Sequence, residues 1–84
     1  MGEFADDAYN YYMLLEAEAE NIYEAYAENS LDWQTKEGVL INVKDMSDNH
    51  IINTKLFLEK TKDKSFRTKA WIWVFEDQIK KRKL

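Results

Sequence analysis

The stretch LDWQTKEGVLINVKDMSDNHIINTKLFLEK (residues 31–60) changes its hydrophobic period from two to about four halfway along. Side chains alternate in character in residues 31–35 and again in residues 39–44, as they do in half-buried strands. The intervening KEG places Gly38 where a hairpin loop needs a positive φ. We therefore expect a two-stranded hairpin, which is marginal alone and needs a helix to cover its apolar face.

The second half of this stretch predicts a helix that begins near Ser47. Ser47 suits the N-cap, Asp48 complements the dipole in the first turn, and Met46 is placed to pack against Ile51. Apolar residues then occur nearly all round the helix: Ile51, Ile52, Leu56, Phe57 and Leu58. Such a helix is expected to lie centrally, in contact with several elements.

A third helix is expected from Phe66 to Arg82, after a polar loop. Its main apolar stripe consists of Trp71, Ile72, Phe75 and Ile79, with Val74 at its edge. Trp73 lies nearly opposite this stripe, on the side of Phe66 and Ala70. Two interpretations of Trp73 stay open, a contact with the first helix or an exposed anchor for a partner.

Residues 4–29 predict a long N-terminal helix. Its small and aromatic residues recur at spacings of three and four and form a heptad-like seam: Ala5, Ala8, Tyr12, Leu15, Ala19, Ile22 and Tyr26. The seam is either the core-facing stripe of this domain or the interface of a homodimer.

These elements predict a single α+β domain over residues 1–84, in the order α-β-β-α-α. An acidic helix occupies residues 1–30, and the hairpin with two helices occupies residues 31–84. Trp33, Ile41 and Val43 are expected to share a hairpin face. That face is expected to rest on Ile51, Ile52 or Leu56.

The composition points to a soluble protein of the cytoplasm. The chain has no cysteine, hence neither a disulfide framework nor a thiolate metal site. No apolar run approaches the length of a membrane span, and the N-terminus lacks the features of a signal peptide.

Charge divides the chain sharply. Residues 1–35 hold nine acidic residues and no Lys or Arg, whereas residues 36–84 hold twelve basic and seven acidic residues. Within the first part, four glutamates stand four residues apart and form what we term the acidic row: Glu16, Glu20, Glu24 and Glu28. Like charges at this spacing lie on one helix face and weaken the helix.

Two interpretations of the acidic row follow. It is a solvated face or a docking site for the chain's own Lys-rich half, or it binds an external basic partner. Four residues rise about 6 Å along a helix. That rise is close to the spacing of successive phosphates, so an acidic helix is suited to the basic groove of a nucleic-acid-binding protein.

No pattern of catalytic residues is present, and we predict neither enzymatic activity nor a cofactor. The chain lacks a Gly-rich phosphate loop, and His50 is its only histidine. His50 with Asp45 and Asp48 is an unspecific set of metal ligands, and a capping or packing role is the simpler interpretation. The basic, aromatic C-terminal half is an alternative site for a phosphorylated nucleotide, with His50, Arg67 and Lys69 as candidate ligands. Direct binding of nucleic acid is less favoured, because the sequence pI is near 4.9.

The stretch from Trp33 to Lys60 resembles a motif of small phage and prophage proteins, Trp-x-Thr-x-x-Gly, Ile-x-Val and Asp-Met-x-x-x-His-Ile-x-Asn. The matching residues are Trp33, Thr35, Gly38, Ile41, Val43, Asp45, Met46, His50, Ile51, Asn53, Leu58 and Lys60. Residues 70–82 also resemble the closing helix of those proteins. The resemblance assigns no catalytic or binding residue. It implies expression in the cytoplasm of an infected bacterium, where small accessory proteins often block host defence.

The leading hypothesis is therefore a phage accessory protein that inhibits a host defence protein, in the manner of an anti-CRISPR, through the acidic row and Trp73. The alternatives are a protein that sequesters a nucleotide signalling molecule and a homodimeric interaction module.

Overall fold

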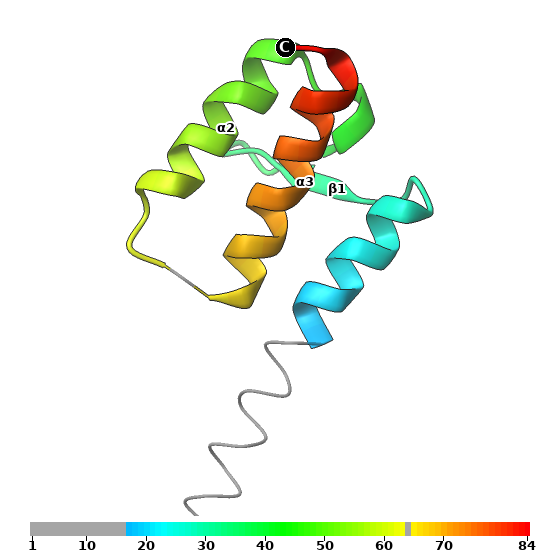
Figure 1. The fold of residues 1–84 in the computed structure, drawn as a ribbon, viewed down its shortest axis with the longest axis vertical. Coiled ribbons are helices and arrows are strands. Elements are labelled where there is room, and N and C mark those ends of the chain that lie inside the picture. The colour runs from blue at the N-terminus through cyan, green and yellow to red at the C-terminus, as the bar shows by residue number, and fades with distance from the viewer. Residues whose placement is uncertain (1–16, 64) are drawn as a thin grey trace, which may run out of the picture.

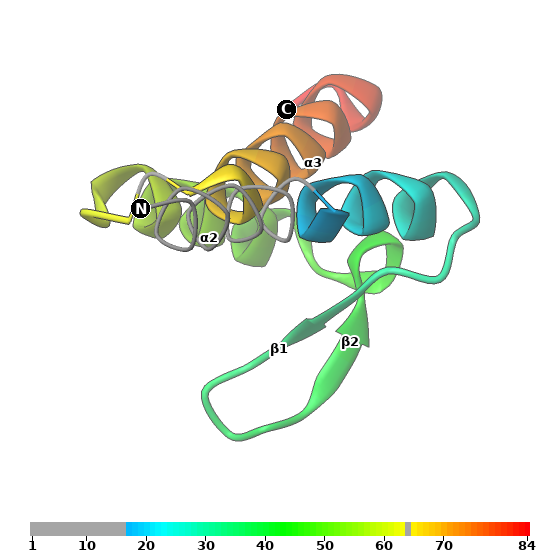
Figure 2. The same cartoon turned by 90° about the horizontal axis from the view of Figure 1, so that it is seen from below.

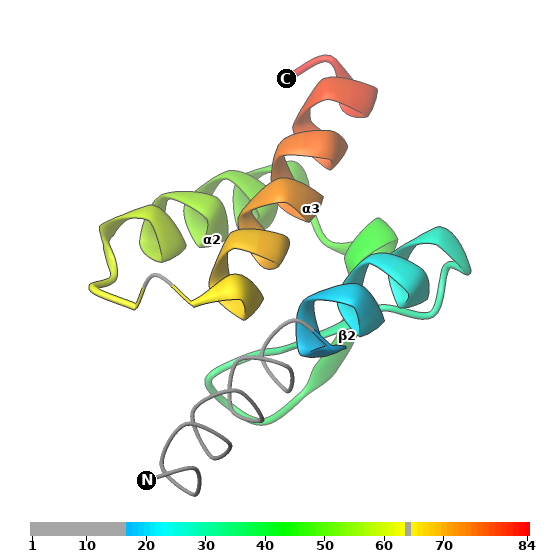
Figure 3. The ribbon, with the colours of Figure 1, turned by 60° about the horizontal axis from the view of Figure 1, so that its bottom comes forward.

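The computed structural model describes residues 17–63 and 65–84, and it confirms the predicted α+β class. A helix that is described over residues 17–27, here the N-terminal helix, is followed by a hairpin and by helices α2 and α3. Helix α3 lies between α2 and the N-terminal helix (Figures 1 and 3). The hairpin extends from beneath the layer of helices (Figure 2).

The hairpin pairs β1 (Asp32–Gln34) with β2 (Leu40–Asn42) in antiparallel orientation, with Trp33 opposite Ile41. Gly38 has a φ of 84°, as the loop sequence predicts. Two hydrogen bonds close the loop, from Thr35 N to Val39 O at 2.9 Å and from Gly38 N to Thr35 O at 2.9 Å.

The second strand ends earlier than predicted. Residues expected to continue it form a 3-10 helix, η1 (Val43–Asp45). The Asn42 side chain accepts a hydrogen bond from Lys44 N at 3.0 Å and so stabilises the turn in place of a further strand. Val43 N still donates to Leu31 O at 3.0 Å, and the Val43 side chain is fully buried.

Helix α2 (Asp48–Lys60) begins as predicted, because Ser47 Oγ accepts a hydrogen bond from His50 N at 3.2 Å. Its predicted central position is wrong. Leu56 is 44% exposed and Phe57 is 67% exposed. The reason is that α2 packs along one side of α3 and buries a single face, which leaves the other apolar side chains outside.

Helix α3 (Phe66–Arg82) has the predicted bounds and is the central element. Elements cover it on more than one side, so its buried set extends beyond the predicted stripe: Thr68, Ala70, Trp71, Val74, Phe75 and Gln78. Trp33 packs edge-to-face on α3, with its ring centroid 4.9 Å from that of Trp71 and 5.5 Å from that of Phe75. The aromatic contacts of Trp33 are thus with α3, whereas we had expected its hairpin face to rest on α2.

The N-terminal helix packs through Ala19, Ile22 and Tyr26, which are buried in the core of the domain. These three members of the predicted seam are therefore used within the domain. The earlier members of the seam lie outside the described residues.

Candidate functional site

The acidic row occupies an exposed face of the N-terminal helix in the described part. Glu20, Glu24 and Glu28 are exposed and project away from the buried residues Ile22 and Tyr26. Glu16 lies outside the described residues. With a rise of about 1.5 Å per residue, the three described carboxylates are spaced along some 12 Å of helix.

The row has no cationic partner in the described part of the chain. None of the ion pairs there involves Glu20, Glu24 or Glu28. Three basic side chains are instead paired with acids of their own half: Lys55 with Glu59, Lys81 with Asp77, and Arg82 with Asp48. The arrangement thus gives no support to docking of the basic half on these three glutamates.

Tyr26 fixes the N-terminal helix to α3 through a buried polar network. Its hydroxyl donates to Asp77 Oδ2 at 2.5 Å and accepts from Gln78 Nε2 at 2.8 Å. Lys81 Nζ lies 2.9 Å from Asp77 Oδ2 and 5.3 Å from the centre of the Tyr26 ring. Burial, followed by the hydrogen bond to Asp77, raises the pKa of Tyr26, and that hydrogen bond lowers the pKa of Asp77. The helix that carries the acidic row is therefore held in one orientation.

Trp73 serves as a contact between helices and is also partly exposed. Its ring centroid lies 5.2 Å from that of Tyr23 and 6.0 Å from that of Tyr26, in edge-to-face geometry. Its side chain remains 48% exposed. Together with Tyr23, Trp73 adds an aromatic border to the N-terminal helix.

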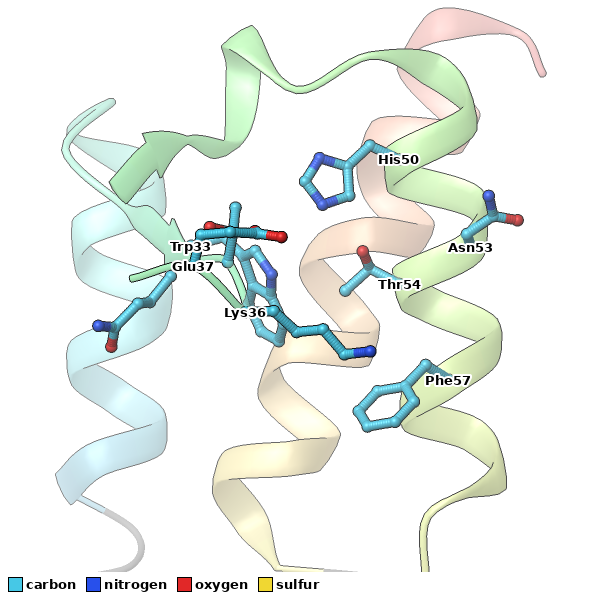
Figure 4. A pocket seen from close by; sticks show the side chains of 9 residues that line it. Trp33, Lys36, Glu37, His50, Asn53, Thr54 and Phe57 are labelled. Atoms are coloured by element: carbon cyan, nitrogen blue, oxygen red, sulfur yellow. The ribbon is translucent and has the colours of Figure 1, made fainter. Parts of the chain in front are cut away.

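His50 lines a hollow between the hairpin and α2 (Figure 4). The hollow has a volume of about 630 Å³. Trp33 and Phe57 supply aromatic walls, and Lys36 extends toward Phe57 across the opening. Four of the residues that carry the phage resemblance border it, namely Trp33, Thr35, His50 and Asn53.

The candidate nucleotide ligands do not converge in one site. Arg67 borders a second, smaller hollow of about 240 Å³, which shares Trp33 and Phe57 with the first. Lys69 borders neither hollow, and its Nζ lies 5.9 Å from the centre of the Phe66 ring.

Each hollow also contains an acid beside its Lys or Arg. Glu37 accompanies Lys36 in the larger hollow, and Asp63 accompanies Arg67 in the smaller one. Hydrogen bonds from Ser65 and Thr68 lower the pKa of Asp63, with a smaller contribution from Arg67. The formal charges of these side chains balance, so neither hollow has the excess of positive charge that favours phosphate.

Arg82 has a structural role that the sequence reasoning missed. Its guanidinium group donates to Met46 O at 2.7 Å, to Lys44 O at 3.2 Å and to Val43 O at 3.3 Å. It thereby fixes the end of α3 to η1 and to the start of α2. In the sequence Arg82 is part of a basic run at the end of a helix, where basic residues commonly interact with the helix dipole, and nothing marks it out from its neighbours.

Among the described residues there is no group of three or more His, Asp or Glu side chains arranged to hold a metal ion. No helix within the same residues is long and apolar enough to cross a membrane. Comparisons with protein-family models, curated proteins and solved structures find no match to this chain. The resemblance to phage proteins therefore stays a prediction.

Proposed function

We propose that the protein is a non-enzymatic phage accessory protein that inhibits a nucleic-acid-binding defence protein in the host cytoplasm. In this proposal the acidic row enters a basic groove of the target and takes the place of nucleic-acid phosphates. The observation that carries the proposal is the exposure of Glu20, Glu24 and Glu28 without a cationic partner in the described chain.

The energetics of the row favour a role in binding. Like charges at i,i+4 destabilise a helix by a few tenths of a kcal/mol for each pair. Glu24 and Glu28 also lie near the C-terminal end of the helix, where its dipole opposes negative charge. An external cationic surface relieves both costs, whereas the solvent-exposed row leaves them in place.

The attachment of the helix supports the same proposal. Tyr26 and Trp73 hold the N-terminal helix against α3, so the carboxylates keep their spacing without a partner. A preorganised charged surface loses less conformational entropy on binding than a disordered acidic tail does. Trp73 and Tyr23 border the row and are suited to additional apolar contact with the target.

The test compares two variants that remove the same charge. The row variant changes Glu20, Glu24 and Glu28 to Gln. The control variant changes three exposed acids outside the N-terminal helix: Asp32 to Asn, Asp45 to Asn and Glu76 to Gln. Each protein is immobilised and exposed to bacterial lysate, and the captured proteins are identified by mass spectrometry.

We expect the wild type and the control variant to capture the same nucleic-acid-binding protein. A double-stranded oligonucleotide should release that protein, and rising salt should weaken its capture. The row variant should fail to capture it. Capture by the folded row variant at the level of the wild type, or capture that the oligonucleotide does not reduce, would contradict phosphate mimicry.

A further inference from the structure

The outer edge of β1 carries backbone groups without partners. Backbone bonds join the two arms of the hairpin just outside the paired strands, from Val43 N to Leu31 O and from Thr35 N to Val39 O. In an antiparallel pair, every second residue of a strand directs its N–H and C=O groups away from the partner strand. Asp32 and Gln34 therefore present these groups outward, and Gln34 N has no hydrogen bond within the described residues.

The larger hollow runs along this edge. Trp33 and Gln34, the last two residues of β1, both border it, although successive side chains of a strand point to opposite faces. Two neighbouring residues of a strand border one hollow when the hollow lies at the edge of the strand. Thr35, Lys36 and Glu37 of the hairpin loop continue this border. Figures 2 and 3 agree with this placement, because β1 is the hairpin strand nearer to α2 in both views.

The opposite wall of the hollow is one face of α2. It is formed by His50, Asn53, Thr54 and Phe57, which follow the i, i+3, i+4, i+7 spacing of a helix face. The exposed edge of β1 thus faces a helix across the hollow, an arrangement that suits the addition of an extended segment as a further strand.

We propose that this groove binds an extended peptide segment of a partner protein by β-strand addition to β1. The backbone of the segment pairs with Gln34 N–H and C=O, and an apolar side chain enters between Trp33 and Phe57. The balance of Lys36 against Glu37 favours an uncharged backbone over a phosphorylated ligand. One wall of the groove is α2, and α2 lies on the opposite side of α3 from the N-terminal helix (Figure 1), so this site is separate from the acidic row.

The test uses a random peptide library, displayed on phage and selected on the immobilised full-length protein. A selected peptide is then synthesised, and its Kd is measured by fluorescence anisotropy. Phe57→Ala should weaken binding by about tenfold or more, because Phe57 forms the outer wall. Leu56→Ala is the matched control, since Leu56 is also exposed on α2 but does not border the groove. Its Kd should stay within about twofold of the wild-type value.

A second pair of variants tests recognition of the backbone. Gln34→Pro removes the outward N–H of β1 without removing a bond to β2, and proline is tolerated at strand edges in this orientation. It should weaken binding by about tenfold, whereas Gln34→Ala keeps the N–H and should bind as the wild type does. If Gln34→Pro does not fold, the peptide is N-methylated at the residue that pairs with Gln34. This change removes a backbone N–H of the peptide and tests the same pairing.

Three outcomes would overturn the proposal. The first is selected peptides whose binding is indifferent to Phe57→Ala, or to both Gln34→Pro and peptide N-methylation. The second is AMP or ATP shifting the NMR signals of His50 and Phe57 at concentrations near those of the peptide, which would assign the groove to a nucleotide. The third is a dimer that Gln34→Pro dissociates, which would assign the edge to a second copy of this chain.

Discussion

Arg82→Met should be among the most destabilising single changes outside the apolar core. The guanidinium group of Arg82 makes five hydrogen bonds, of which the shortest reaches Met46 O at 2.7 Å and another joins Nε to Gln78 Oε1 at 3.0 Å. The Arg82 side chain is 18% exposed, and its bonds to Gln78 Oε1, Met46 O and Val43 O are partly buried. Methionine has a similar length and keeps the apolar part of the packing, but it leaves the acceptors unpaired.

The expected loss follows from the two partly buried bonds to backbone carbonyls, those to Met46 O and Val43 O. A hydrogen bond that involves a charged group contributes about 1.5–3 kcal/mol to stability. Part of that loss is recovered, because both bonds are only partly buried and water solvates the freed carbonyls. We therefore expect the free energy of unfolding to fall by about 2–4 kcal/mol. A domain of this length has a total of only about 4–13 kcal/mol.

The assay is equilibrium unfolding in urea, followed by tryptophan fluorescence. With a slope of about 1–2 kcal/mol per M, the midpoint should fall by roughly 1–4 M. Asp48→Asn is the matched control. It removes only the ion pair, whose carboxylate is 59% exposed, and should cost at most about 1 kcal/mol. A midpoint for folded Arg82→Met within error of the wild type would refute the reasoning, as would an equal loss for Asp48→Asn.

Three further predictions concern the core, the Tyr26 network and the acidic row. Trp33→Ala should lower the free energy of unfolding by about 3–5 kcal/mol, since it removes the ring that packs on α3, and calorimetry should show this as a reduced Tm. Tyr26→Phe should destabilise the protein near pH 7, where Asp77 is ionised. This deficit should shrink as the pH falls through the lowered pKa of Asp77, because the stability that the ionised carboxylate contributes is then lost in the wild type as well. The raised pKa of Tyr26 adds stability that is lost as the pH rises through that pKa. The urea unfolding curves of the wild type and Tyr26→Phe should therefore converge at both low and high pH. The row variant should unfold at a temperature equal to or above that of the wild type, since two like-charge pairs are removed, and a clear decrease would show that the glutamates stabilise the fold.

Much of the fold was predictable because local signals agreed with the tertiary structure. The loop at Gly38, the N-cap at Ser47 and the bounds of α3 each depend on a few neighbouring residues. The buried stripe of the N-terminal helix was likewise visible in its spacing, through Ile22 and Tyr26. Predicting these features requires no knowledge of which elements lie side by side.

The remaining features depend on tertiary contacts that the sequence does not express. Phe57 was expected in the core, yet α2 buries only one face and leaves it exposed beside the groove. The packing of the Trp33 ring on Trp71 and Phe75 of α3 was not predicted, since periodicity identifies the face of a strand but not its neighbour. Arg82 looked like one of several basic residues, because its acceptors are backbone carbonyls more than thirty positions away. Backbone acceptors have no sequence signature.

The attachment of the N-terminal helix has a consequence for protein engineering. In the described region Ala19, Ile22, Ala25 and Tyr26 pack in or against the core and Tyr23 contacts Trp73, while Glu20 and Glu24 are exposed and form no ion pair there. The exposed face of this helix can therefore be changed independently of the face that packs on the domain. A designer who keeps these contact residues is free to change the exposed face and so to graft a different recognition helix onto the same domain. Correct packing of a grafted helix can be followed by near-ultraviolet circular dichroism, because the contact of Tyr26 with Trp73 should give the same signal whatever residues the new face carries.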